Sequence, residues 1–193
     1  MIELLSNYGD IAVVWFDTPG NLGGKYSAAL VDLVKKHQPD CLINSRIGNG
    51  FGDYASLGDM QIPLTQSPGA WESIDTTNDS WSYAWYDEHW KSAKTIAQNL
   101  ISVVARGGSY MLNIGPKGDG SIPYNAVKNL TDAGAWIRRN EEAIYETTPS
   151  PFTAFEWGDC TVKENSIYIH IFKRPESGVL RLPSFKNNIR KSS

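Results

Sequence analysis

The sequence has few cysteines, no long hydrophobic run and nearly balanced charge, and each of these features excludes a class of protein. Its 193 residues include two cysteines, Cys41 and Cys160, too few for a disulfide framework or a cysteine-based zinc site. No apolar stretch approaches the roughly 20 residues that span a membrane. The formal net charge of -3 gives no electrostatic reason to expect a nucleic acid or an anionic membrane as partner.

The remaining composition is that of an ordinary globular protein. Hydrophobic residues make up 41% of the chain and charged residues 20%, enough to bury the core of one domain or of one domain and part of another. The seven tryptophans and nine tyrosines exceed what a plain scaffold needs, and such aromatic faces commonly stack against sugars. No secretory leader is recognised, so the location is unknown and, for the sequence as it stands, expected to be cytoplasmic.

Apolar strands alternate with amphipathic helices over residues 1–147, which predicts about four parallel βα units. Each predicted strand ends in polar or charged residues, and residues 47–69 form a loop long enough to suggest a function. About four units are half of the eight that close a (β/α)8 barrel of the TIM type. The predicted strands are residues 11–17, 41–46 and 110–116, with a further short strand and its loop within residues 71–83, and the predicted helices are residues 24–37, 89–106 and 123–145.

The character of the sequence changes after residue 147. Residues 161–172 alternate in the manner of a β-hairpin with its turn at Glu164 and Asn165, and residues 179–182 are predicted to form a further strand. Residues 186–193 are expected to be a frayed end. The predicted organisation is therefore a half-barrel catalytic region over residues 1–147 and a truncated antiparallel β region over residues 148–193.

The predicted strand ends would bring acidic, basic and aromatic side chains to one edge of the sheet. Asp17 ends the first strand, Arg46 follows the second and Glu72 lies beside Trp71 on the third. Two carboxylates, one to attack or stabilise the anomeric carbon and one to transfer a proton, are the minimum equipment for glycoside hydrolysis. Position alone leaves open that Asp17 is only a turn or helix-capping residue.

Six collinear motifs resemble the α-L-fucosidases of glycoside hydrolase family 29. The motifs are Trp15-Phe16-Asp17; Asn44-Ser45-Arg46-Ile47-Gly48; Gly52-Asp53-Tyr54 with Gly58-Asp59; Trp71-Glu72 with Asn78–Tyr83; Leu112–Pro116 with Asp119–Pro123; and Asn140–Tyr145. They cover nearly the whole chain, which then corresponds to the second half of the family's catalytic barrel and the start of its β domain. The histidines, tryptophan and acidic groups of the family's first half-barrel are not in this sequence.

The resemblance implies a role for the residues that match the family's motifs. Asp17 would be the nucleophile of a retaining mechanism, Trp15 would line the sugar pocket and Arg46 would contact the fucose or the nucleophile. Trp71 and Trp81 are further candidates for substrate binding. The family often has aspartate in the middle of its asparagine-aspartate-arginine motif, where this chain has Ser45.

The acid/base residue varies between branches of the family. One branch uses the glutamate of a threonine-proline-glutamate motif, which this chain replaces by Ile62-Pro63-Leu64. In the branch that this chain resembles more, the acid/base is the glutamate of a tryptophan-glutamate pair, here Glu72. Asp59 and Asp53 are the alternatives, unless they only cap loops.

The sequence therefore predicts a retaining α-L-fucosidase or transfucosidase that forms a covalent fucosyl-enzyme and needs no metal or organic cofactor. Its expected partner is a fucosylated oligosaccharide or glycoconjugate. An open half-barrel would expose strand edges and apolar surface, so we expect a homodimer in which each chain completes the other's core. The alternatives are a catalytically inactive or weakly sugar-binding fragment, and a different retaining glycosidase specificity on the same frame.

Overall fold

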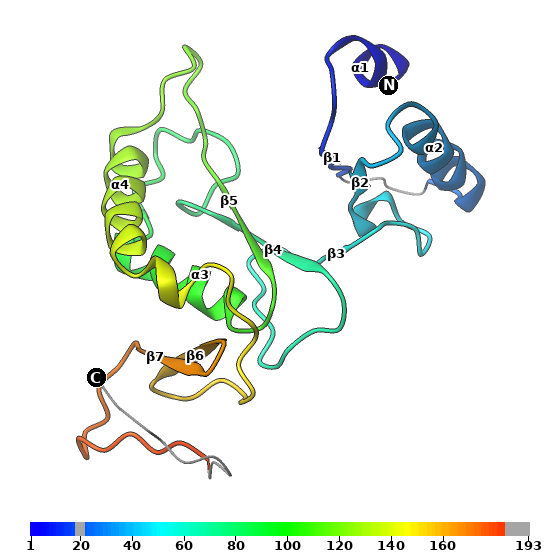
Figure 1. Cartoon of the computed structure of the whole chain (residues 1–193). Helices are drawn as coiled ribbons and strands as arrows, with labels where there is room; N and C mark the ends of the chain where they lie inside the picture. Colours follow the sequence, from blue (N-terminus) through cyan, green and yellow to red (C-terminus); the bar gives the residue numbers. More distant parts are fainter. Residues whose placement is uncertain (18–21, 184–193) are drawn as a thin grey trace.

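The structure is a computed structural model, which describes residues 1–17 and 22–183 of the chain (Figure 1). Its described part contains five parallel strands: β1 (Val13–Val14), β2 (Leu42–Ile43), β3 (Ala55–Ser56), β4 (Trp71–Thr76) and β5 (Ser109–Asn113). β1 pairs with β2, and β3, β4 and β5 form a second set, all in parallel. A parallel bridge between Asn44 and Tyr54 joins the two sets. The strands thus follow one another across the sheet in chain order, with their carboxyl ends at one edge.

Helices α2 (Gly24–His37) and α3 (Ala93–Val104) lie between these strands in the chain, whereas α1 (Ile2–Asn7) precedes β1 and α4 (Tyr124–Arg139) follows β5. α1 packs against α2, which runs from β1 to β2, while α3 packs against α4 on the β4 and β5 side (Figure 1). Two 3-10 turns complete the set, η1 (Ser45–Ile47) and η2 (Glu141–Ala143). The described residues contain no helix that is both long and apolar enough to cross a membrane.

The predicted helix over residues 24–37 is confirmed, whereas two other helix boundaries were wrong. α3 begins four residues later than predicted because the Ser92 side chain accepts a hydrogen bond from the Thr95 backbone and caps it there. α4 ends at Arg139 instead of residue 145 because Asn140 has a non-helical backbone with φ -121° and ψ 22°. The chain then tightens into η2.

The strand predictions also needed correction. The loop predicted over residues 47–69 contains β3, so the sheet has five strands in its described part where four were expected. β1 and β2 are two residues each, much shorter than the apolar runs that contain them. After β2 the chain turns into η1, which removes Arg46 from the strand but keeps it at the sheet edge.

A buried cluster between the first helices and strands forms one part of the core. It consists of Leu5, Val14, Val34, Cys41, Ile43 and Ile47. Cys41 and Cys160 are both buried free thiols. Burial raises the pKa of the Cys160 thiol to about 11, with the charge of Asp159 adding to the effect.

A polar network joins β4 to the elements that follow it. The buried Asp75 carboxylate accepts hydrogen bonds from the Tyr110 hydroxyl at 2.7 Å and the Asn99 amide at 3.0 Å, and pairs with Lys91 Nζ at 3.1 Å. Burial opposes the charge of Asp75, but the Tyr110 hydroxyl, the Thr76 backbone and Lys91 outweigh it and lower its pKa. The network holds α3, β5 and the segment before α3 in register with β4.

The carboxyl-terminal part forms the predicted antiparallel hairpin, with strands β6 (Gly158–Lys163) and β7 (Ser166–Ile171). The turn falls at Glu164, whose φ of 52° is left-handed. Arg106, just after α3, forms a buried ion pair with Asp159 of β6 at 3.0 Å. The strand predicted over residues 179–182 is absent from the structure, where this stretch has no regular ladder. The frayed end predicted at residues 186–193 lies outside the described residues.

Candidate active site

Asp17 and Arg46 meet at the carboxyl edge of the sheet, as the parallel strands predict. Asp17 follows β1, and Arg46 lies on η1 directly after β2, with its Nη1 atom 3.1 Å from Asp17 Oδ1. The Nη2 atom of the same guanidinium forms an ion pair with Asp59 and donates to the Leu57 carbonyl at 3.2 Å. One arginine therefore holds two carboxylates that come from distant parts of the sequence.

The guanidinium of Arg46 also lies over Trp15, with 5.0 Å between its central carbon and the ring centroid. This is the distance of a cation–π contact. Burial disfavours the charge of Arg46, but its hydrogen bonds to Asp59 and Asp17 outweigh that cost and raise its pKa. Arg46 is thus a permanent positive charge at the centre of the cluster.

Glu72 lies at the other side of Trp15. The indole Nε1 of Trp15 donates to Glu72 Oε1 at 2.5 Å, and the Ser56 hydroxyl donates to the same oxygen at 2.8 Å. Burial, and then the nearby Glu72 carboxylate, raise the pKa of Tyr54 to about 12. Glu72 itself is only 8% exposed. A continuous chain of contacts therefore runs from Asp17 through Arg46 and Trp15 to Glu72.

Asn44 fixes the backbone immediately before Asp17. Its amide oxygen accepts from the Phe16 backbone N–H at 2.8 Å, and its amide nitrogen donates to the Phe16 carbonyl at 2.9 Å. Asn44 is fully buried, and these two hydrogen bonds tie its side chain to the backbone segment that follows β1. The next residue, Ser45, accepts from the Ser56 backbone at 2.9 Å. In this way Asn44 fixes the end of β1, and Ser45 fixes β3. Arg46 holds the two carboxylates.

Two predicted residues lie outside this cluster. Asp53 pairs with Lys35 of α2 at 2.9 Å and accepts from the Ile43 backbone at 2.8 Å; the Lys35 hydrogen bond is the main cause of its lowered pKa. Trp71 is 2% exposed and donates its indole N–H to the Arg106 carbonyl at 3.2 Å. Because side chains alternate along β4, Trp71 and Glu72 point to opposite faces. Trp71 is therefore buried in this structure on the face opposite Glu72, and a sugar contact for it stays a prediction that this burial disfavours.

Trp81 lies in the loop over residues 77–92, which follows β4, and its side chain is partly exposed. Within this loop each of three residues offers one atom of a type that ligates metals, and these atoms lie within 4.8 Å of one another. The residues are Asp79, Asp87 and His89. The Asp87 oxygens accept hydrogen bonds from the Asp79 and His89 backbones and from the Ser80 hydroxyl. These hydrogen bonds, of which the one from Ser80 has the largest effect, lower the pKa of Asp87. They also connect the two ends of the loop.

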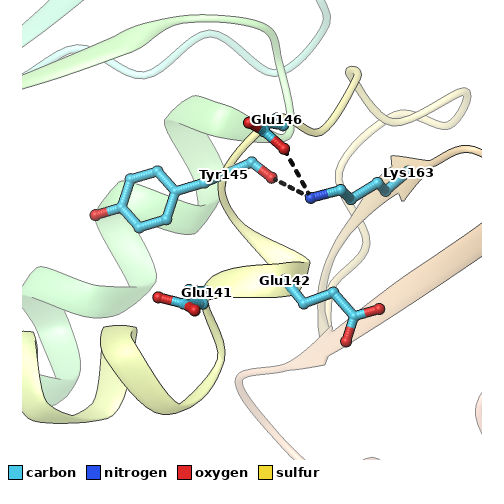
Figure 2. Close-up of a pocket in the computed structure, with 5 residues that line it drawn as sticks. All are labelled: Glu141, Glu142, Tyr145, Glu146 and Lys163. Atoms are coloured by element: carbon cyan, nitrogen blue, oxygen red, sulfur yellow. Dashed lines mark hydrogen bonds and ion pairs between the residues drawn. The ribbon is translucent and has the colours of Figure 1, made fainter.

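A separate hollow of about 330 Å³ lies where η2 packs against β6, lined by Glu141, Glu142, Tyr145, Glu146 and Lys163. Figure 2 shows Lys163 reaching the Tyr145 carbonyl at 3.2 Å and the Glu146 carboxylate at 3.3 Å. These are residues of the junction with the β region. None of them contacts the Asp17 and Arg46 cluster through a hydrogen bond between described residues.

Two carboxylates on one arginine, above a tryptophan at the carboxyl edge of parallel strands, define an α/β protein with the side chains of a glycoside hydrolase. The family model described as alpha-L-fucosidase matches residues 1–142. The chain belongs to this family, glycoside hydrolase family 29, and the resemblance found in the sequence is confirmed.

Curated relatives cover the same stretch. Plasma alpha-L-fucosidase from Homo sapiens is 29% identical over 200 residues, which is 94% of this chain and 42% of that protein. Alpha-L-fucosidase from Dictyostelium discoideum is 29% identical over 150 residues, 73% of this chain and 32% of that protein. The chain thus spans at most about two fifths of the length of these relatives.

Solved structures agree. The alpha-L-fucosidase from Vibrio sp. strain EJY3 has a TM-score of 0.90 at 36% identity, over 98% of this chain and 35% of that chain. Isoenzyme 1 from Paenibacillus thiaminolyticus has a TM-score of 0.84 at 33% identity, over 90% and 45%. AlfC from Lactobacillus casei, solved with α-L-fucose product, has a TM-score of 0.67 at 40% identity, over 73% and 43%.

Proposed function

We propose that this chain carries the nucleophile side of a retaining α-L-fucosidase site, with Asp17 as the nucleophile and a fucosylated oligosaccharide or glycoconjugate as substrate. The observation that carries the proposal is the Arg46 guanidinium, which holds Asp17 and Asp59 on its two terminal nitrogens. One guanidinium that bridges both groups keeps the two carboxyls close together, as a retaining mechanism requires, where the carboxyls lie about 5–5.5 Å apart.

The proposed reaction has two balanced steps. In the first, an Asp17 oxygen attacks the anomeric carbon, the glycosidic bond breaks, and the departing oxygen takes a proton from the acid/base carboxyl. In the second, the acid/base residue, now a carboxylate, takes a proton from water. The water oxygen attacks the anomeric carbon and releases Asp17. An acceptor alcohol in place of water would give transfucosylation. Arg46 balances the negative charge of Asp17 before the attack and after the release, when Asp17 is not bonded to the sugar.

For the acid/base, the sequence predicts Glu72, and the side-chain geometry favours the alternative Asp59. Asp59 is half exposed, with 49% of its side chain accessible, and shares an arginine with Asp17. Glu72 is buried and already accepts two hydrogen bonds on one oxygen, which suits it to holding Trp15. A proton donor must reach the departing oxygen, so we assign this step to Asp59 and keep Glu72 as the residue to test against it.

The test compares wild type with Asp17→Gly, Asp59→Asn and Glu72→Gln on an aryl α-L-fucoside. Asp17→Gly should lose turnover, and azide should restore it as the β-fucosyl azide. Asp59→Asn should lower the rate for poor leaving groups by about 10²–10⁴-fold, and azide should then give the α-anomer. Azide rescue of Glu72→Gln to the α-anomer would transfer the role to Glu72.

Two outcomes reject larger parts of the proposal. Turnover by Asp17→Gly without azide would exclude Asp17 as the nucleophile. Absence of turnover by pure wild type, with the fold intact, would favour the alternative of an inactive or weakly sugar-binding fragment.

We also propose that strands β1–β5 are a continuous part of a (β/α)8 barrel. Their parallel pairing in chain order supports this, as do helix α2 between β1 and β2 and helix α3 between β4 and β5. A barrel has no open edge, whereas β1 and β5 each lack a second neighbour within the described residues. We therefore expect the site to depend on a further chain segment or a second copy that covers these edges.

A further inference from the structure

The loop over residues 77–92 presents four aromatic side chains to solvent. Trp81 and Tyr83 are partly exposed, while Trp85 and Tyr86 are 78% and 73% exposed. Trp85 and Tyr86 are adjacent in sequence and meet edge to face, with ring centroids 5.8 Å apart and an interplanar angle of 87°. Single exposed aromatic side chains are ordinary, whereas a group of neighbouring ones is typical of a binding surface.

The loop is held in a defined shape although its aromatic residues are exposed. Asp87 is buried and accepts from the Asp79 backbone at 3.1 Å, the Ser80 hydroxyl at 2.7 Å and the His89 backbone at 3.1 Å. His89 Nδ1 lies 2.9 Å from Asp79 Oδ2, which closes the loop at its base. These hydrogen bonds fix the backbone on both sides of Trp85 and Tyr86, which reduces the conformational entropy that the loop would lose on binding a ligand.

The same loop is fixed to the carboxyl end of β5. The Asn113 amide donates to the Trp81 carbonyl at 2.7 Å, and the Asn113 carbonyl accepts from the Thr77 backbone at 3.0 Å. Gly115 lies so close to the loop that a Cβ there would be 2.7 Å from the Ser82 carbonyl carbon. Because the strands are parallel, this places the loop on the sheet edge that also carries Asp17.

The charge of the loop selects the kind of ligand. Residues 77–92 contain three acidic residues, Asp79, Asp87 and Glu88, and one lysine, Lys91, whose Nζ pairs with Asp75 at 3.1 Å, so an anionic partner is disfavoured. Asp79 and Glu88 are exposed and offer acceptors for hydroxyl groups. Aromatic faces with nearby acceptors, in a loop whose one lysine is paired with Asp75, fit a neutral ring that has an apolar C–H face and hydroxyls at its rim, which describes a pyranose.

We propose that Trp85 and Tyr86 form a binding platform for the sugar to which the fucose is attached, an inference that rests on the proposed function and assigns its leaving-group side. The platform would select fucosides of neutral saccharides over fucosides with no sugar beyond the fucose. It would also hold an acceptor sugar during transfer.

The test compares wild type, Trp85→Ala and Tyr86→Ala on two substrates, a fucosyl-N-acetylglucosamine disaccharide and α-L-fucosyl fluoride, which has no sugar on its leaving-group side. Each substitution should lower the ratio of the two kcat/KM values, disaccharide over fluoride, by about 3- to 10-fold, the size expected for loss of one aromatic stacking contact. Tyr124→Ala is the matched control because Tyr124 is 75% exposed at the start of α4. An unchanged ratio in the loop variants overturns the proposal.

A second measurement separates this proposal from the proposed function. The indole N–H resonance of Trp85, assigned with Trp85→Phe, is followed by NMR during titration with methyl N-acetylglucosaminide. A saturable shift at Trp85 supports the platform even if wild type hydrolyses neither substrate, in which case only the proposed function fails. No shift overturns the platform, and a shift that follows protein concentration instead of sugar assigns the surface to a second copy and overturns it as well.

Discussion

Asn44, Ser45 and Arg46 follow one another in the chain, and each holds a different neighbour at the sheet edge. Asn44 binds the Phe16 backbone on both its N–H and carbonyl sides, Ser45 binds β3, and Arg46 binds Asp17 and Asp59. The amide of Asn44 takes the place of a strand partner for Phe16. Asn44 is therefore the positioning residue that sets where Asp17 leaves the sheet.

Replacing Asn44 by alanine should impair both stability and catalysis. The Phe16 N–H and carbonyl would lose their partners in a buried site, which should lower the free energy of unfolding by about 2–4 kcal/mol. Displacement of Asp17 should lower kcat by about 100-fold with a smaller change in KM. Urea unfolding and steady-state kinetics on the aryl fucoside measure the two effects.

The control places the same substitution in the Asp17→Gly background with azide. If Asn44 acts through Asp17, the azide-rescued rate should not fall further when Asn44 is removed. An equal loss in both backgrounds would instead indicate general damage to the fold. Asn49→Ala is a useful comparison, since Asn49 also donates two hydrogen bonds, to Leu22 and Ser27 on the α2 side, and should leave kcat little changed.

The meeting of Asp17 with Arg46 could be predicted from sequence because both residues follow apolar runs, and parallel strands end at one edge. The contribution of Asp59 could not be assigned from its spacing. It lies beyond β3, a two-residue strand within a stretch of glycine and proline that gives no periodic signal. The burial of Trp71 could not be predicted from its neighbour Glu72, because strand alternation places the two side chains on opposite faces.

At the scale of elements, the helices were easier to predict than the strands. The 14 residues of α2 give a full apolar period with Lys35 and Lys36 at the end, whereas β1 to β3 are two residues each. The runs around β1 and β2 are apolar on both faces although only one face is buried here, and side chains such as Asn44 replace part of the backbone ladder. In these short strands the apolar pattern therefore predicts that a strand is present, but it does not predict where the backbone ladder ends.

The loop over residues 77–92 depends on its contact with Gly115. A methyl group at Gly115 would lie 2.7 Å from backbone atoms of the loop, so Gly115→Ala should push the loop away from β5. We expect a loss of about 1–3 kcal/mol in unfolding free energy and faster amide exchange at the Asp79 and His89 backbones. Gly118→Ala is the control, because a Cβ there meets nothing within 4 Å; equal effects from the two variants would contradict this account.

The hairpin β6–β7 should make stability depend on pH through His170. His170 is buried beside Thr161, with Nε2 3.0 Å from the Thr161 hydroxyl. Burial lowers its pKa, and the charge of Asp159 only partly opposes this. Because the folded-state pKa lies below the unfolded value of about 6.5, the stabilisation is complete above that value and is lost as pH falls through the folded-state pKa.

Urea unfolding between about pH 7.5 and pH 5 tests this dependence. The wild type should lose more unfolding free energy on acidification than His170→Gln, in which this titrating group is absent. His37→Gln, at the end of α2, serves as the control and should follow the wild type. A parallel decrease in wild type and His170→Gln would show that other groups cause the acid sensitivity.

At the scale of the whole molecule, the first strands leave apolar side chains uncovered. Val13 of β1 and Leu42 of β2 are 42% and 46% exposed although both lie in strands. β1 also presents an unpaired edge within the described residues. An open parallel edge next to exposed apolar residues promotes association, and the chain aligns with about two fifths of its curated relatives.

We therefore expect the isolated chain to form a two-fold dimer through the β1 edge, as the sequence predicts for an open half-barrel. Val13→Lys places a charge on that surface and should raise the dimer dissociation constant by at least about 10-fold, measured by sedimentation. Val179→Lys, at an exposed position outside any element, should have little effect. A monodisperse wild-type monomer at all concentrations would contradict the dimer.

If the partner completes the site, fucosidase activity per chain should fall on dilution through the dissociation constant, because monomers leave the edge beside Asp17 uncovered. Activity that stays constant through dissociation would show that one chain suffices.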